Sequence, residues 1–210
     1  MEETDSLELF LNFCNLCYLN PMEAGKCYHI YNRGVNRQPI FFNTENYWFF
    51  LRKFKQYLTG LVEVYAYCLM PNHFHFFIKV KDDTDEKFAD KALSRVEKAF
   101  KDFFISYAKS VNVEQGRTGA LFQYKFKRKE VEEPDYYSSL IGYIHFNPVR
   151  AKLCEEVSHW QFSSYNAFLS DKPTLVSRSE VLEWFGGPGG FLAFHRSNIE
   201  FATKRDWEID

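Results

Sequence analysis

The most regular pattern of apolar and polar residues along the chain covers residues 62–80, VEVYAYCLMPNHFHFFIKV. Two alternating apolar segments flank Pro71-Asn72, a turn dipeptide, and this pattern predicts a β-hairpin whose second strand begins at His73. Successive side chains of a strand point to opposite faces of the sheet. We therefore expect Phe74 on one face, packed beneath helices, and His73 and His75 side by side on the other.

Similar patterns predict the elements on either side of this hairpin. Alternation over residues 26–33 predicts a first strand. Apolar residues spaced three and four apart over 44–58 predict a helix that opens at Asn43 and stops at Gly60. Residues 85–110 show the same spacing over a longer distance, so a long amphipathic helix is expected there.

A basic segment follows, with five cations and no acid between Glu114 and Glu130. The sequence FQYKFKRKEV alternates aromatic and basic residues, which predicts a strand with one solvated, positive face. Lysines protect exposed sheet edges, and cations interleaved with aromatic residues also suit single-stranded nucleic acid, whose bases stack while its phosphates pair. Both interpretations stay open for these cations: Arg117, Lys125, Lys127, Arg128 and Lys129.

The next predicted helix, YYSSLIGYIHFN, covers residues 136–147. Asp135 can cap its start and Pro148 is expected to end it. Tyr143 and Asn147 are four residues apart and therefore share one face, which Tyr136 nearly shares as well.

The order strand, helix, strand, strand, helix, strand predicts an α+β fold of the ferredoxin-like βαββαβ type, an antiparallel sheet with helices on one face. In this arrangement the face that carries His73 and His75 is expected to be open. The helix at 136–147 and the rest of the chain follow as additions. We expect residues 1–26 to form an N-terminal extension, 27–150 the main domain, and 151–210 a C-terminal extension packed on it.

Composition narrows the cellular setting more than the function. The chain has 210 residues, of which 46% are hydrophobic, enough for one generous core. The net charge of −2 gives no overall sign of a nucleic-acid partner, so that inference depends on the local basic segment. The sequence shows neither a long apolar run nor a secretory leader, so we expect a cytoplasmic protein without membrane insertion.

Five cysteines are then expected to be reduced thiols. Cys14 and Cys17 form a lone CxxC, with Cys27 and His29 as the nearby residues that could complete a zinc site. A structural zinc site usually shows a second close pair, so ordinary thiols are favoured here.

His73 and His75 are the strongest candidates for chemistry. Two imidazoles that project side by side from a strand can both reach one metal ion or one phosphate, and neutral histidine is the commonest metal ligand. The alternative is that one histidine packs in the core and the other is solvated.

Five motifs, taken together, resemble one family. They are YNRGVNRQPIF (31–41), YCLMPNHFHFFIKV (67–80), GALFQYKFK (119–127), YIHFNPVRAKL (143–153) and WQFSSY (160–165). In this order they resemble the single-tyrosine HUH transposases of the IS200-like group, and among these the REP-associated tyrosine transposases. The resemblance covers about two thirds of the chain, and the pair MPNHxHxxI and YIHxNPVRA is its most specific part.

The resemblance implies a transposase that nicks single-stranded DNA and transfers the strand through a covalent phosphotyrosine. Tyr143 would be the nucleophile, and His73 and His75 would bind a divalent metal, Mg or Mn, with Asn147 as a third ligand. The IS200 subgroup has a glutamine at the position of Asn147, four residues after the tyrosine. The partner implied is single-stranded DNA that forms hairpins, with the basic segment as the DNA-binding surface.

Simple chemistry agrees with these roles. A phenol has an unperturbed pKa near 10 and needs a nearby cation or base to attack at neutral pH. A divalent ion would polarise the scissile phosphate and neutralise developing charge. Two imidazoles favour Mn or Zn over Mg, which prefers oxygen ligands, so the asparagine, the phosphate and waters would have to supply oxygen atoms.

Two other classes of function remain open. A ferredoxin-like sheet with aromatic residues can bind single-stranded DNA or RNA hairpins without chemistry. An inactive relative would keep the motifs as remnants of the fold. The sequence leaves the oligomeric state, monomer or homodimer, undecided.

Overall fold

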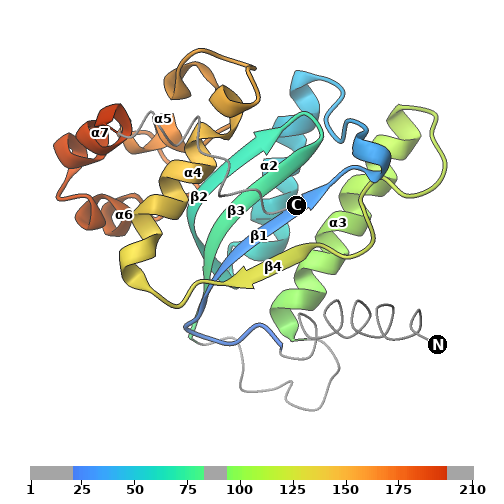
Figure 1. The fold of residues 1–210 in the computed structure, drawn as a ribbon. Coiled ribbons are helices and arrows are strands. Elements are labelled where there is room, and N and C mark those ends of the chain that lie inside the picture. Colours follow the sequence, from blue (N-terminus) through green and yellow to red (C-terminus); the bar gives the residue numbers. More distant parts are fainter. Residues whose placement is uncertain (1–20, 83–93, 198–210) are drawn as a thin grey trace, which may run out of the picture.

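The computed structural model describes residues 21–82 and 94–197, and its centre is a four-stranded antiparallel sheet (Figure 1). The order of the strands across the sheet is β2-β3-β1-β4, which matches the predicted ferredoxin-like arrangement. The strands are β1 (Cys27–Arg33), β2 (Val62–Met70), β3 (His73–Val80) and β4 (Lys127–Glu130). The predicted hairpin is therefore confirmed, with its turn at Pro71-Asn72.

Two helices, α2 (Thr44–Leu58) and α3 (Arg95–Glu114), cover one face of the sheet (Figure 1). Phenylalanine side chains form the contact: Phe54 stacks on Phe76 with ring centroids 4.4 Å apart, and Phe50 meets Phe74 at 5.2 Å. Each of these four side chains is fully buried. This layer is the core that the alternation of β3 predicts.

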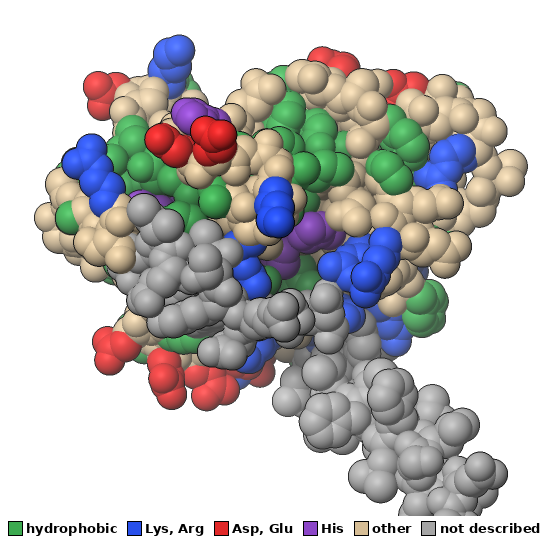
Figure 2. All heavy atoms as spheres, turned by 45° about the horizontal axis from the view of Figure 1, so that its top comes forward, with side chains coloured by type: hydrophobic (Ala, Val, Ile, Leu, Met, Phe, Trp, Pro, Cys, Tyr) green, Lys and Arg blue, Asp and Glu red, His purple; other side chains and the backbone are tan. Residues whose placement is uncertain are grey.

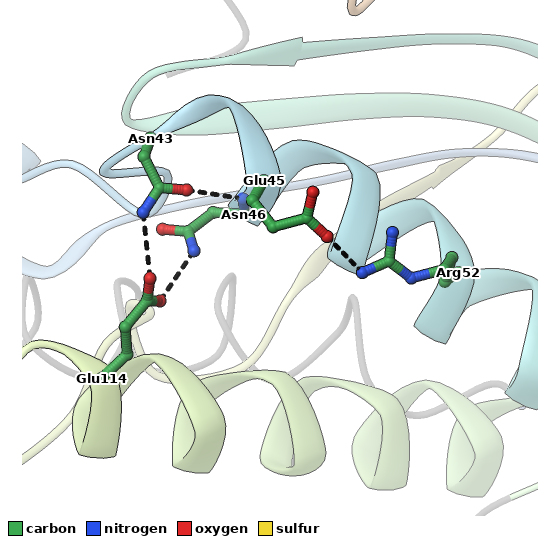
Figure 3. A network of polar contacts seen from close by, with 5 residues as sticks. All are labelled: Asn43, Glu45, Asn46, Arg52 and Glu114. Carbon is green, nitrogen blue, oxygen red and sulfur yellow. Dashed lines mark hydrogen bonds and ion pairs between the residues drawn. The ribbon is translucent and has the colours of Figure 1, made fainter.

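Polar residues at the start of α2 join it to the end of α3 (Figure 3). The Asn43 side chain caps α2 by accepting from the Asn46 backbone N–H, as predicted. Glu114 accepts hydrogen bonds from the side-chain amides of Asn43 and Asn46, at 2.9 and 2.7 Å. These contacts fix the relative position of the two helices at one end.

The opposite face of the sheet is covered in part by α4 (Tyr137–Arg150), which packs mainly on β2 and β3. Tyr137 packs against Phe77, and Tyr143 against His75. The prediction that the histidine face is open is therefore wrong over these two strands. The reason is that α4 is almost wholly apolar between Leu140 and Phe146, so it has to bury its surface against the sheet.

Shorter elements complete the described chain. After α4 the chain packs beside β2, where Cys68 pairs with Ser163 and Val64 with Val176, so the outer edge of β2 is covered. These elements are η1 (Val35–Arg37), η2 (Pro134–Tyr136), η3 (Val157–His159), α5 (Tyr165–Phe168), α6 (Arg178–Trp184) and α7 (Pro188–Ser197).

Two predicted helix starts are wrong. The long helix begins at Arg95 rather than at residue 85, because Ser94 and Glu97 form a capping box there. Asp135 does not cap α4: residues 134–136 form a short 3-10 turn, and α4 begins after it without a side-chain cap.

Two further boundaries were also mispredicted. Pro148 lies inside α4, which continues to Arg150, so the missing N–H of this proline does not end the helix. β4 covers only residues 127–130 of the predicted strand, because Lys125 has a φ of 60° and interrupts the extended chain.

Among the described residues, none of the helices has both the length and the apolar character needed to cross a bilayer. Cys14 and Cys17 lie outside the described residues, as does the expected N-terminal helix. Cys27, Cys68 and Cys154 are free thiols.

A buried pair of histidines joins the C-terminal helix to the body. His145 Nδ1 lies 3.0 Å from His195 Nε2, and His145 Nε2 lies 2.8 Å from the Ser164 hydroxyl. His195 Nδ1 donates to the Phe191 carbonyl, so its Nε2 accepts from His145. Burial lowers the pKa of His195 to about 4 and that of His145 well below its ordinary value.

We expect this pair to make stability fall in acid. Both imidazoles are neutral when folded and take up protons near pH 6.5 when unfolded, so stability is lost as the pH falls from about 6.5 towards 4, at up to about 1.4 kcal/mol per pH unit for each histidine. Urea unfolding between pH 7 and pH 4.5 measures this slope. The double variant His145→Gln/His195→Gln should show a shallower slope, whereas His159→Gln, at an exposed histidine, should leave it unchanged.

Candidate active site

The two histidines of β3 lie on the predicted face, and the strand pairing shows which residues accompany them. His75 is opposite Tyr31 and His73 is opposite Arg33 on β1, so these side chains share one face. The rings of His73 and His75 are perpendicular, with centroids 5.3 Å apart. His73 is half-buried, and His75 is only 4% exposed.

Hydrogen bonds orient both imidazoles. Asn72 donates its side-chain amide to the Arg37 carbonyl, so its oxygen accepts from His73 Nδ1 at 2.7 Å. His75 Nδ1 lies 3.0 Å from His29 Nε2, on the neighbouring strand. In both residues Nδ1 is engaged, and Nε2 is the nitrogen that can carry a lone pair towards a ligand.

Burial keeps the imidazoles of His75 and His29 in their neutral form. It lowers the pKa of His75 well below its ordinary value, and the neighbouring charges of His29, His73, Arg33 and Arg150 lower it further. Burial, aided by Lys129, also lowers the pKa of His29 to about 3. A neutral imidazole is the form that binds a metal ion.

Helix α4 brings Tyr143 to these histidines. Its ring is edge-on to His75, with centroids 5.6 Å apart, and to His29 at 6.1 Å. The Arg150 guanidinium lies 5.3 Å from the centre of the tyrosine ring. Tyr143 thus has two imidazoles and a cation beside it, although only 4% of its surface is exposed.

Asn147 lies one helical turn after Tyr143 and is also buried. Its side-chain N–H donates to the Tyr143 carbonyl at 2.9 Å. This contact holds the amide on the helix and leaves its oxygen as the atom that can act as a ligand.

The donor set fits a divalent ion only in part. Within the described residues, no group of three or more His, Cys, Asp or Glu side chains is placed to hold a metal. The two β3 histidines could supply two nitrogen ligands, and oxygen ligands would have to come from Asn147, a bound anion and water. The residues therefore fit an ion only if a further bound group completes its coordination.

Two of the predicted cations line the same face. Lys127 is opposite Tyr31, and its amine lies 5.7 Å from the centre of that ring. Lys129 is opposite His29, and both lysines are exposed. In Figure 2, Lys and Arg side chains lie on both sides of the histidine side chains visible at the centre of the face.

Arg128 was also predicted to bind DNA, but the structure places it on the other face from Lys127 and Lys129. It is opposite Ile30, so it points to the helix-covered face, where it forms an ion pair with Glu97. The two side chains are each 7% exposed. Strict alternation along β4 would have indicated this, because Lys127 and Lys129 flank Arg128 on the other face.

The structure places the other two predicted cations outside the strand. Lys125 is exposed, with its amine 5.6 Å from the ring centre of Tyr124. Arg117 donates to Gln38 and lies over the Phe42 ring at 5.6 Å, next to η1.

Three site residues were not predicted as such from the sequence: His29, Tyr31 and Arg150. The alternation of β1 indicates that His29 and Tyr31 share a face, with ring centroids 5.0 Å apart. Their position beside His75 depends on the pairing of β1 with β3, which the sequence does not specify. Arg150 belongs to the segment that resembles the family. Because the helix was predicted to end at Pro148, Arg150 was not placed on it.

Comparison with known proteins agrees on the fold. A solved structure described as a REP-associated tyrosine transposase bound to a REP hairpin superposes with a TM-score of 0.58 and 16% sequence identity, covering 73% of this chain and 86% of that one. The chain shares its fold with that transposase. Neither a protein-family model nor a curated protein matches the sequence.

Proposed function

We propose that the protein is a transposase-like enzyme that nicks single-stranded DNA and transfers the strand through a phosphotyrosine, with Tyr143 as the nucleophile. The observation that carries this proposal is the position of Tyr143, whose ring lies edge-on to His75 at 5.6 Å with Arg150 beside it. Three residues from two elements far apart in the sequence thus meet at one place.

In this reaction the Tyr143 phenolic oxygen forms an ester bond to the phosphorus as one P–O bond of the strand breaks, and the leaving oxygen takes up a proton. The Arg150 guanidinium adds positive charge next to the phenol, which favours the ionised nucleophile. Because the bond energy is conserved in the phosphotyrosine, a second strand end can be joined by the reverse step.

A divalent ion, Mg or Mn, would be held by His73, His75 and Asn147, and it would neutralise charge that develops on the phosphate. The support lies in the orientation of the histidines, because both engage Nδ1 and so direct Nε2 towards a ligand. Asn72 and His29 are the residues that hold this orientation.

The partner we propose is single-stranded DNA that forms a hairpin. Similarity of fold to a transposase bound to a REP hairpin supports it. So do Lys127 and Lys129, which present two exposed cations on the histidine face, where phosphates would approach. Lys125 and Arg117 could extend this surface at the loop that precedes β4.

A second candidate function is hairpin binding without catalysis. Its support is that Tyr143 is only 4% exposed and that the described residues lack a three-ligand cluster. A binding protein would need the cations and the aromatic residues, but it would not need His73, His75 and Tyr143 together.

One experiment separates the two functions. The protein is incubated with hairpin-bearing single strands from its own genomic flanks, with Mn or Mg, and analysed on denaturing gels. The proposed enzyme forms a covalent protein–DNA species that requires the metal. Binding without such a species, with every divalent ion tried, would favour the non-catalytic function.

The cations of β4 give a separate prediction about DNA binding. Each phosphate contact releases counterions, so the double variant Lys127→Ala/Lys129→Ala should bind single strands more weakly and with a salt dependence shallower by about 0.7 in log K per log salt for each lost contact. Fluorescence anisotropy from 50 to 300 mM salt measures this slope.

The matched control is Lys101→Ala/Lys109→Ala, which removes two exposed lysines from α3 on the opposite side of the sheet. We expect this control to leave the salt slope unchanged. An equal slope in both double variants would assign the β4 lysines to protection of the sheet edge alone.

A further inference from the structure

A pocket of about 350 Å³ lies between β4 and the start of α4, next to the sheet face that carries His73 and His75. Its apolar walls are Val131 and Leu140, with the Tyr136 side chain beside them. His29 contributes to the pocket lining and links it to the site, because its Nε2 is hydrogen-bonded to His75. The volume is within the range of sites that bind small organic groups.

One residue of the lining, His29, has a polar atom that is shielded from solvent and unsatisfied. His29 is 1% exposed, and its Nδ1 has no hydrogen-bond partner among residues 21–82 and 94–197. A buried polar atom without a partner is costly, and a bound water, ion or ligand is one explanation of such an atom in a native protein. A ligand that offers a hydrogen-bonding atom to His29 would remove this cost.

The hydrogen bond to His75 decides which kind of atom His29 offers. For His75 to present Nε2 as a metal ligand, its Nδ1 must carry the proton and donate it to His29 Nε2. The proton of the neutral His29 ring then has to be on Nδ1, which becomes a donor. The ligand in the pocket must therefore offer an acceptor.

The charges around the pocket argue against a phosphate as that ligand. Lys129 is the cation of the lining, whereas Glu130, Glu132 and Glu133 contribute three carboxylates. Glu130 is also paired with Lys26, so its charge is partly balanced. A neutral group with acceptor atoms and a flat ring suits these walls better, and a nucleobase has both.

We propose that this pocket receives one unpaired base of the single-stranded DNA, which stacks on Tyr136 and accepts a hydrogen bond from His29 Nδ1. The proposal rests on the proposed function, since it takes that DNA as the ligand and His75 as a metal ligand. It adds a specificity site, a positioning role for His29, and a connection between the two. The carboxylates at the rim can accept from an exocyclic amino group, which favours adenine, cytosine or guanine over thymine.

The connection has a direct consequence for metal binding. A base that accepts from His29 Nδ1 stabilises the tautomer in which His75 Nε2 is available, so the base should tighten metal binding. By thermodynamic reciprocity the metal should tighten base binding by the same factor. A DNA strand with the correct base and the metal ion would then each favour binding of the other.

The test uses the full chain with Tyr143→Phe, which prevents cleavage, and a set of single strands in which each position in turn is abasic. In EDTA, we expect one abasic position to weaken binding by about 5- to 100-fold, the usual range for loss of a stacked base. This sensitivity should disappear when Tyr136→Ala is added, and persist with Tyr136→Phe, which keeps the ring. His29→Phe should weaken the sensitivity to this abasic position. If His29→Phe does not fold, the comparison of Tyr136→Ala with Tyr136→Phe decides.

Mn²⁺ binding, followed by electron paramagnetic resonance, tests the connection. The intact and the singly abasic strand carry the same phosphates, so any difference in Mn²⁺ affinity reports the base alone. We expect several-fold tighter Mn²⁺ binding with the intact strand, and no difference in the His29→Phe or Tyr136→Ala protein. Histidine ¹H–¹⁵N correlation spectra should show His29 protonated on Nδ1 when the intact strand is bound.

The failures of the two proposals are distinguishable. If no abasic position matters, or if the sensitive position stays sensitive in Tyr136→Ala, the pocket does not hold a base, whether or not wild-type protein forms the covalent species. Equal Mn²⁺ affinity with the two strands would overturn the connection. A base-sensitive pocket in a protein that never forms the covalent species would overturn the enzyme and leave the pocket.

Discussion

Replacing Tyr143 with phenylalanine should abolish the covalent protein–DNA species, a loss of about 10³-fold or more, while single-strand binding changes little. The substitution removes the attacking oxygen and keeps the ring that packs against His75 and His29. Denaturing gels with labelled DNA measure the adduct, and anisotropy measures binding by the same protein.

Two neighbouring tyrosines provide controls. Tyr137 packs between Phe77 and Trp184, with ring centroids 5.1 Å from each, so these two side chains hold its ring. Tyr136 is the serious rival, because it lines the pocket beside His29. Tyr136→Phe should keep the adduct. If Tyr143→Phe still forms it and Tyr136→Phe does not, the nucleophile is Tyr136.

The sequence predicts the strands and helices that carry the site, because local patterns determine these elements. Alternation in 62–80 places the histidines on one face and the phenylalanines on the other, and the Asn43 cap sets the start of α2. The predictions fail where a residue type that usually ends an element is accommodated inside it. Pro148 is a helix breaker in general, yet in the last turn of α4 it is accommodated, and Arg150 thereby reaches the Tyr143 ring.

The partners of the histidines could not be predicted in the same way. His29 reaches His75 across the β1–β3 pairing, 46 residues away in the sequence, and one step of register would move it to the other face. The contact of α4 with this face depends equally on tertiary packing. For this reason the sequence predicts that His73 and His75 share a face, but not which residues orient them.

The largest stability effect should come from the ion pair between Arg128 and Glu97. The Glu97 carboxylate has two functions: one oxygen accepts from the Ser94 backbone N–H at 2.7 Å in the capping box of α3, and the other pairs with Arg128 on β4. Both side chains are 7% exposed. One carboxylate thus joins the start of α3 to a sheet edge only four residues long.

Arg128→Ala should lower the free energy of unfolding by about 3–5 kcal/mol, because it leaves a buried carboxylate without its partner. Urea unfolding measures this loss. Lys127→Ala and Lys129→Ala, at the exposed positions on either side, should each cost less than about 0.5 kcal/mol. The double variant Arg128→Met/Glu97→Gln removes both charges and should recover part of the loss. A cost below about 1 kcal/mol for Arg128→Ala would show that the pair is solvated, and would return Arg128 to the group of cations available to DNA.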